Sequence, residues 1–399
     1  MRSRGAALVP LYAASAVLTV GEGSFGLLVP PYMHGRGSSD VLVGTAISVY
    51  GIVSLLARLP AGALYRSHRA WQLIGFGTVL SSAAFFLLTR TSSPGLLIAF
   101  VALDGAGFAI ASTANMAALI DRRPPGSDAG SIMGWYTGSL GAGYAVSGFV
   151  GGAVGDALGP GGAIAVLALV PLAAGLSLSL AMRSTAPVRT HTEKTRLLHG
   201  FRGLPALVWL AFFVTLYINL VSGVVLTFFP IYGLAIGLSL TQIGFLTGIH
   251  GIASSVVRFL SGAVFRWVSY ERTLPAMIVL SGLSVALIGG VKALVVLGIA
   301  WGGLGLARGL LRVASAALVM DGAGTTDASR GAASSVYLAG LDFGKILGPL
   351  AGGLGSSTIG LRGTFLVSSL TLPAVYFVLA ALSRRRGGRR EPALASSEP

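Results

Sequence analysis

Eight ionisable side chains lie within long apolar stretches of the sequence, and their types suggest what the protein could do. A charge near the centre of a bilayer costs several kcal/mol on insertion scales, so such a residue usually faces a cavity or a charged partner. The eight residues are Glu22, Arg58, Asp104, Arg258, Arg308, Arg312, Asp342 and Lys345. We therefore take them as the first candidates for a functional site.

The charges are unevenly divided along the chain. Glu22 and Asp104 are acidic and lie in the first half, whereas Arg308, Arg312 and Lys345 are basic and lie in the second. Arg308 and Arg312 are spaced i, i+4, so they share one helix face and repel each other unless an anion lies near. The second half also contains Asp342, at i, i+3 from Lys345.

Two interpretations of these charges stay open. In the first, the groups neutralise one another as structural ion pairs. In the second, they line a cavity whose carboxylates exchange a proton and whose cations hold an anionic group of a substrate. On the second, the predicted proton-coupling residues are Glu22 and Asp342, and the predicted substrate-binding residues are Arg308, Arg312, Lys345, Asp104, Asn219 and Tyr217. Weaker candidates are His250, which stands where the first half has Tyr50, and Tyr144.

Nothing in the sequence predicts catalysis. The chain has no Cys, so a disulfide framework, a thiolate metal site and a cysteine nucleophile are excluded. It has no glycine-rich phosphate loop with Lys, no paired metal-ligating His and no nucleophile elbow. We expect no catalytic residue, no metal and no cofactor, and we expect the protein not to be an enzyme.

The composition predicts the elements that position these residues. Of 399 residues 54% are hydrophobic and 10% are charged, where soluble proteins carry about 25% charged residues. A membrane-crossing helix needs about 20 apolar residues. Twelve such stretches are predicted at 6–32, 41–64, 71–89, 95–119, 131–153, 161–182, 205–235, 241–264, 273–290, 294–319, 331–355 and 363–383. They are continuous rather than alternating, which argues against a β-barrel.

The basic residues predict the orientation. With cytoplasmic termini, only Arg36, Arg90, Lys292 and Arg362 fall on the outside, and most of the 28 Lys and Arg fall inside, as the positive-inside rule requires. The first stretch is too long for a signal-peptide core and is expected to stay as a helix. The net charge of +15 is spread over short loops and a tail, so no nucleic-acid partner is expected. We expect a multi-pass cell-membrane protein, in a bacterial inner membrane.

An internal repeat is the most specific signal in the sequence. At an offset of 200 residues, Pro30, Tyr32 and Arg58 recur as Pro230, Tyr232 and Arg258. The same offset pairs Asp121 with Asp321, Gly148 with Gly348, Gly152 with Gly352 and Gly155 with Gly355. Two parallel six-helix halves are therefore predicted, as in transporters with a midplane site. The expected divisions are 1–182, a linker at 183–203, 204–383, and a basic tail at 384–399.

Motifs between these helices resemble the major facilitator superfamily over essentially the whole chain. The stretch Arg58–Arg66 and its echo Arg258–Arg266 look like the family's cytoplasmic loop motif, but both have Arg where that motif has Asp. Gly105–Ala109 resembles the helix-four pattern, and Gly348–Gly353 resembles the Gly-Pro pattern of exporters. By this resemblance the gating residues are Arg58, Arg66, Asp121, Arg258, Arg266 and Asp321. Arg58 and Arg258 are expected to meet a carboxylate or helix-end carbonyls, with Asp121 and Asp321 as the nearest acids.

The predicted function is secondary active transport of a small organic solute by alternating access, with proton-coupled export first. Uptake or exchange of an organic anion is the alternative, because Arg308, Arg312 and Lys345 could bind it. A lipid scramblase or a membrane-embedded enzyme is the remoter alternative. The expected partners are the solute, protons and membrane lipids, and the protein is expected to be a monomer.

Overall fold

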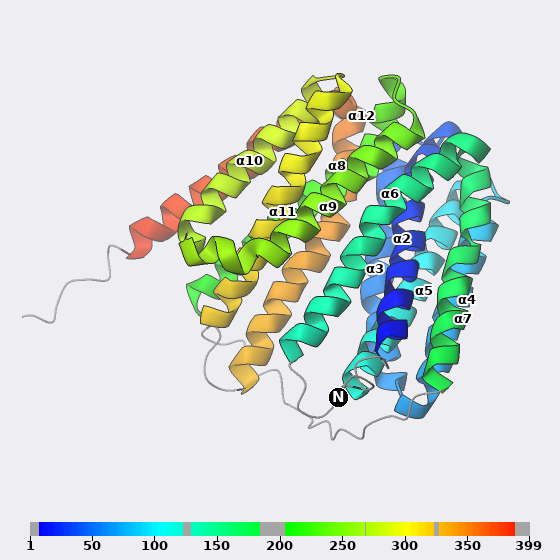
Figure 1. Ribbon diagram of the computed structural model, residues 1–399. Coiled ribbons are helices and arrows are strands. Elements are labelled where there is room, and N and C mark those ends of the chain that lie inside the picture. Colours follow the sequence, from blue (N-terminus) through cyan, green and yellow to red (C-terminus); the bar gives the residue numbers. More distant parts are fainter. Residues whose placement is uncertain (1–7, 123–128, 184–203, 268, 323–326, 388–399) are drawn as a thin grey trace, which may run out of the picture.

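The computed structural model describes residues 8–122, 129–183, 204–267, 269–322 and 327–387, and within them the chain is helical (Figure 1). The first half contains α2 (Val9–Gly35), α3 (Asp40–Leu64), the short 3-10 helix η1 (Ser67–Arg69), α4 (Ala70–Leu88), α5 (Pro94–Asp121), α6 (Ala129–Leu167) and α7 (Leu169–Arg183). The second half contains α8 (Ala206–Ala235), α9 (Leu240–Trp267), α10 (Tyr270–Gly290), α11 (Leu294–Gly322) and α12 (Asp327–Gly387). The predicted linker apart from Arg183, and most of the predicted tail, lie outside the described residues.

Ten helical segments in the described parts of the chain are long and apolar enough to cross a membrane. Two of them, Trp135–Leu180 and Val336–Val378, span 46 and 43 residues, about twice the length that one crossing needs. Each contains a glycine with positive φ, Gly159 at 70° and Gly360 at 72°, which interrupts the helix. The chain turns at these glycines, because a left-handed backbone conformation suits only a residue without Cβ. The count of twelve crossings stays a prediction.

Helix starts follow local capping rules. Ser39 precedes α3 and its Oγ accepts a hydrogen bond from the amide of Leu42 (3.3 Å). At the matching position, Ser239 and Gln242 form a reciprocal capping box at the start of α9, with N···O distances of 3.0 and 3.2 Å. These caps fix where α3 and α9 begin, and both helices begin at the same end of the bundle, which we call the Asp40 end. The opposite end, where α3 ends, is the Tyr65 end.

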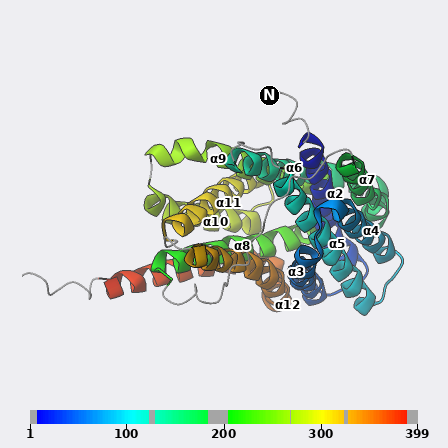
Figure 2. The same cartoon turned by 90° about the horizontal axis from the view of Figure 1, so that it is seen from below.

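The two halves lie side by side and meet along two seams (Figure 2). At one seam α6 packs against α9, and at the other α3 packs against α12. The second seam is in close contact from Asp40 with Gly353 to Gly51 with Ile346, and Ser48 donates a hydrogen bond to the Ile346 carbonyl (2.6 Å). Farther along α3, toward the Tyr65 end, Arg58 is exposed.

The internal repeat is visible as repeated contacts. Tyr32 Oη donates to the Leu88 carbonyl (3.4 Å), and its counterpart Tyr232 Oη donates to the Gly289 carbonyl (3.0 Å). Gly37 and Gly237 both have positive φ, at 84° and 93°. The offset of 200 residues therefore relates equivalent places in the first helices of each half.

In α6 and α12 the equivalent places are shifted by one residue, so three of the predicted pairs are corrected. Gly148 of α6 lies against Gly244 of α9 in the other half. The residue of α12 that lies against the matching glycine of α3, Gly44, is Pro349. Gly152 faces Leu240 as Gly353 faces Asp40. The predicted pairs of Gly148, Gly152 and Gly155 with Gly348, Gly352 and Gly355 are wrong by one position. The cause is one extra residue between Gly305 and Pro349, which an ungapped comparison of apolar helices does not reveal.

Candidate functional site

Two carboxyl groups of the first half lie close together and are hydrogen-bonded by neighbouring hydroxyls. Glu22 of α2 accepts a hydrogen bond from Tyr50 Oη of α3. Asp104 of α5 accepts one from Ser81 Oγ of α4, and it is close enough to Glu22 for their charges to interact. We call Glu22 and Asp104 the acidic wall.

The two members of the acidic wall differ in access. Asp104 has no exposed surface, and its Oδ2 has no hydrogen-bond partner among the described residues. A buried, unpartnered carboxylate is costly, and a neutral carboxylic acid is much less so. Asp104 was predicted to bind substrate; in this conformation a solute cannot touch its side chain. Glu22 is only half-buried, so it is the member that a solute or water can reach.

Three arginines of the second half form a cationic cluster. The charge of Arg258 on α9 interacts with that of Arg312 on α11, and Arg308 interacts with both. Arg308 and Arg312 share a helix face, as their spacing predicts. Arg258 belongs to this cluster, and its Nη2 donates to Ser254 Oγ (2.8 Å). Its gating role stays a prediction.

His250 supports Arg308 from α9. The Nη1 of Arg308 lies 3.3 Å from Nε2 of His250. A guanidinium has only donors, so His250 must accept at Nε2 and carry its proton on Nδ1, as a neutral imidazole. The His250 ring also packs edge-on against the fully buried Trp301, with centroids 5.6 Å apart. His250 thus positions Arg308 without adding a charge.

Lys345 and Asp342 bring α12 into the same site. Lys345 is exposed, and its charge interacts with those of Arg308, Arg312 and Asp342. No ion pair within 4 Å joins Lys345 to Asp342 in the described chain. The interpretation that these two groups simply neutralise each other is therefore not favoured. We call Arg258, Arg308, Arg312 and Lys345 the basic wall.

The acidic and basic walls face each other across the two halves. The charge of Lys345 interacts with Glu22 of α2 and with Arg58 of α3. Tyr144 of α6 lies between the walls, since it interacts with both Glu22 and Arg308. Sequence reasoning gave Tyr144 little weight and gave Tyr50 no role. The repeat held a signal for Tyr50: Gly105 packs on Tyr50 as Gly305 packs on His250, so the two occupy matching places beside the site.

Two predicted substrate-binding residues lie in helix packing instead. Asn219 is buried, and its Nδ2 donates to the carbonyl of Thr215 one turn earlier on α8 (2.9 Å). Tyr217 is also buried, with its Oη 3.5 Å from the Ile278 carbonyl of α10. These contacts do not place either side chain at the acidic wall or the basic wall. The substrate-binding role of Asn219 and Tyr217 stays a prediction.

Of the predicted gating residues, Arg66, Asp121 and Arg266 lie at the Tyr65 end, where α3, α5 and α9 end. At the Tyr65 end, Tyr65 Oη donates to Asp121 Oδ2 (2.6 Å), and burial, followed by this bond, raises the pKa of Tyr65 above its ordinary value. The expected contact of Arg58 with Asp121 is not formed, because Arg58 lies two turns farther into α3 and faces the site. Arg66 Nη1 donates to the carbonyls of Ala63 (3.1 Å) and Tyr65 (2.8 Å). Arg266 is exposed, and the side chain of Asp321 lies outside the described residues.

Comparisons with known proteins give this arrangement a family. The model of the Major Facilitator Superfamily matches residues 11–329. The chain belongs to the Major Facilitator Superfamily. It is therefore a multi-pass membrane transporter of a small molecule, and the resemblance drawn from the loop motifs is confirmed.

Solved structures agree with this superfamily's fold. A bacterial homolog of the human lysosomal transporter Spinster, inward-facing and unoccupied, matches with a TM-score of 0.78 and 17% identity, covering 98% of this chain and 99% of that one. The nucleoside transporter NupG matches with a TM-score of 0.77 and 14% identity, covering 95% and 98%. No curated protein sequence matches the chain significantly. At these identities the likeness establishes the fold and leaves the substrate open.

Proposed function

We propose that this superfamily member is a proton-coupled secondary transporter of a small organic solute that carries an anionic group, working by alternating access in the cell membrane. The observation that carries the proposal is the basic wall. Arg308, Arg312 and Lys345 come together from α11 and α12, and none of them forms an ion pair with a carboxylate of the described chain. Clustered cations of this kind are stabilised by an anion.

The geometry of Arg308 supports recognition of a carboxylate or phosphate. One nitrogen of its guanidinium is engaged by His250, and its Nε has no partner among the described residues. A planar guanidinium suits bidentate binding of a planar or tetrahedral anion. Lys345, which is exposed, offers a second, less directional charge.

The acidic wall supports proton coupling. The positive charge of Lys345 favours the ionised form of Glu22. A bound anion would offset that charge, so binding of the anion favours a protonated Glu22. Loading of both together would couple an inward proton gradient to uptake, the alternative direction, whereas export would require the proton to return on the carrier without the anion. Tyr50 Oη keeps the carboxyl in place, and Asp342 is the second predicted proton carrier.

Export is the proposed direction, on the resemblance of Gly348–Gly353 to the exporter pattern. Uptake or exchange of the same anion is the alternative, and a lipid scramblase or membrane-embedded enzyme is the remoter one. Proteoliposomes of known orientation separate the first two by the sign of the proton gradient that drives accumulation. Lipid flipping without any gradient would favour a scramblase.

Binding of matched probes to the purified protein tests the proposal. Benzoate, benzamide and benzylamine share a ring and differ in charge. The basic wall should therefore bind benzoate and larger aromatic carboxylates with higher affinity than benzamide or benzylamine. Saturable binding of anions that weakens in Arg308→Lys supports the proposal. A preference for cationic probes would overturn it.

A further inference from the structure

A side-chain contact joins the two halves at the Asp40 end of the α6–α9 seam. Asp156, near the end of the first straight part of α6, accepts two backbone hydrogen bonds from the other half. The amide of Leu240 donates to Oδ1 (2.8 Å) and that of Thr241 to Oδ2 (2.9 Å). Leu240 and Thr241 are the first two residues of α9.

The first amides of a helix have no partners within the helix, and the helix dipole favours a negative charge beside them. At α9 the capping box satisfies the amide of Gln242 through Ser239, which leaves Leu240 and Thr241 to Asp156. A carboxylate from one half therefore completes the N-terminal cap of a helix in the other.

The surrounding seam leaves little freedom for this contact. A Cβ on Gly152 would overlap the backbone of Leu240, and one on Gly148 would overlap the backbone of Gly244. The two helices approach this closely only while the halves are together at the Asp40 end. When the halves separate there, the carboxylate and the two amides must lose these hydrogen bonds and be solvated by water.

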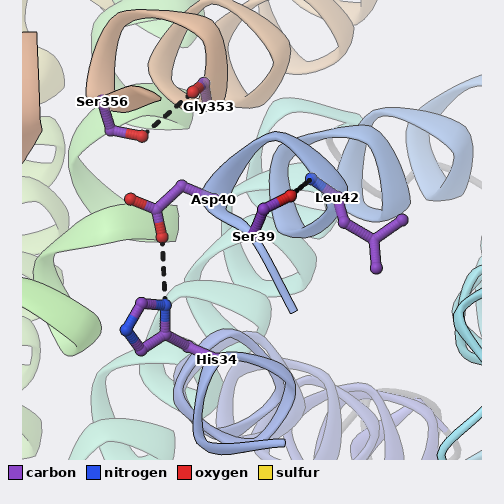
Figure 3. Close-up of polar contacts among 6 residues, drawn as sticks. All are labelled: His34, Ser39, Asp40, Leu42, Gly353 and Ser356. Carbon is purple, nitrogen blue, oxygen red and sulfur yellow. Dashed lines mark hydrogen bonds and ion pairs between the residues drawn. The ribbon is translucent and has the colours of Figure 1, made fainter. Parts of the chain in front are cut away.

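Among the described residues, the other seam has no equivalent contact between the halves. The counterpart of Asp156 on α12 is Ser357, whose Oγ donates to the Leu354 carbonyl of its own helix (2.8 Å). The acidic residue at this seam is Asp40, which belongs to α3 itself and lies 3.1 Å from His34 Nδ1 of the same half (Figure 3). Its charge thus favours the α3 terminus without joining the halves.

We propose that Asp156 is a releasable latch, bound to the N-terminus of α9 while the Asp40 end is closed and released when that end opens. This inference rests on the alternating-access part of the proposed function and is independent of the substrate. Loss of the latch should shift the resting protein toward the conformation open at the Asp40 end.

Distance measurements on spin-labelled protein test the latch, and the absence of native cysteine makes labelling simple. Cysteines replace the exposed Arg36 and Lys292, one in each half at the Asp40 end. Asp156→Asn and Asp156→Ala are compared with Asp40→Asn, which removes an acid from a helix start without touching a contact between the halves. Pulsed dipolar spectroscopy then reports the populations of short and long distances.

We expect Asp156→Ala to raise the ratio of long to short distances about fivefold, the scale of a lost helix cap. Asp156→Asn, which keeps one acceptor oxygen, should give a smaller shift, and Asp40→Asn should give none. An unchanged distribution in a folded Asp156→Asn protein would overturn the latch, as would an equal shift in Asp40→Asn. Failure of anion binding would leave the distances unaffected, so failure of the substrate proposal and failure of the latch are distinguishable.

Discussion

At the scale of residues, the acidic wall is the proposed site of proton coupling, and the sequence predicts only part of it. Glu22 was predicted from its position inside an apolar stretch, but its partner Tyr50 was not, because Tyr50 is 28 residues away and comes close only when α2 and α3 pack. The same limit applies to Arg258, which its motif assigned to a gate and which packing places in the basic wall. Sequence spacing predicts neighbours on one helix, whereas pairs across helices depend on the packed structure.

Glu22→Gln should abolish uphill transport driven by a proton gradient and leave substrate exchange near the wild-type rate. The amide keeps the size and the contact with Tyr50 but cannot carry a proton. Transport by proteoliposomes, with and without a pH gradient, measures both activities. Tyr50→Phe is the matched control, because it retains the carboxyl group. Undiminished accumulation in Glu22→Gln would reject the coupling role.

Arg308→Lys should weaken binding of the anionic probe by at least about tenfold, or 1.4 kcal/mol, with the melting temperature nearly unchanged. Lysine keeps the charge and loses the planar fork. Titration calorimetry on the purified protein measures the affinity. Arg312→Lys is compared in the same way, and Lys345→Arg, which keeps a charge at a less directional position, should change it little. Equal affinity in all the variants would leave these residues as structural charges.

At the scale of elements, glycine sets how closely helices approach across the seams. The expected spans are close to the observed helices, but the sequence does not say which glycines lie at the seams. Gly26 and Gly244 look alike in the sequence. A Cβ on Gly26 would meet nothing within 4 Å, whereas one on Gly244 would overlap the Gly148 carbonyl. Only the register between α6 and α9 distinguishes them.

Gly244→Ala should therefore lower the stability of the folded protein by about 1–3 kcal/mol, the range for overpacking. Gly26→Ala, with open space and a better helix former, should be neutral or stabilising by up to about 1 kcal/mol. Thermal unfolding in one detergent gives the comparison. If the two variants melt together, the close approach at the α6–α9 seam contributes nothing to stability.

For the whole molecule, the fold class and the repeat follow from the sequence because they depend on composition and periodicity. The arrangement of the halves does not, since the two seams use small residues and backbone atoms rather than a recognisable motif. Orientation in the membrane also comes from sequence alone, through the distribution of Lys and Arg.

That orientation is testable in the cysteine-free chain. Lys292→Cys should react with a membrane-impermeant maleimide added to intact cells, because the Asp40 end is expected outside. Arg66→Cys, at the Tyr65 end, should react only after the membrane is permeabilised. Gel shifts of the labelled protein measure both reactions. The reverse pattern would mean that the orientation in the membrane is opposite to the predicted one, with the Asp156 contact on the cytoplasmic side.

Arg308, Arg312 and Lys345 form no ion pair with a carboxylate of the described chain, and this affects every binding measurement in solution. Cations gathered this closely attract small mobile anions from the medium, such as chloride. A substrate must displace those ions, so its measured affinity describes the exchange of one anion for another. That affinity depends on which salt is present and at what concentration. The same protein should bind its solute more tightly in gluconate, a bulky and weakly associating anion, than in chloride at equal ionic strength.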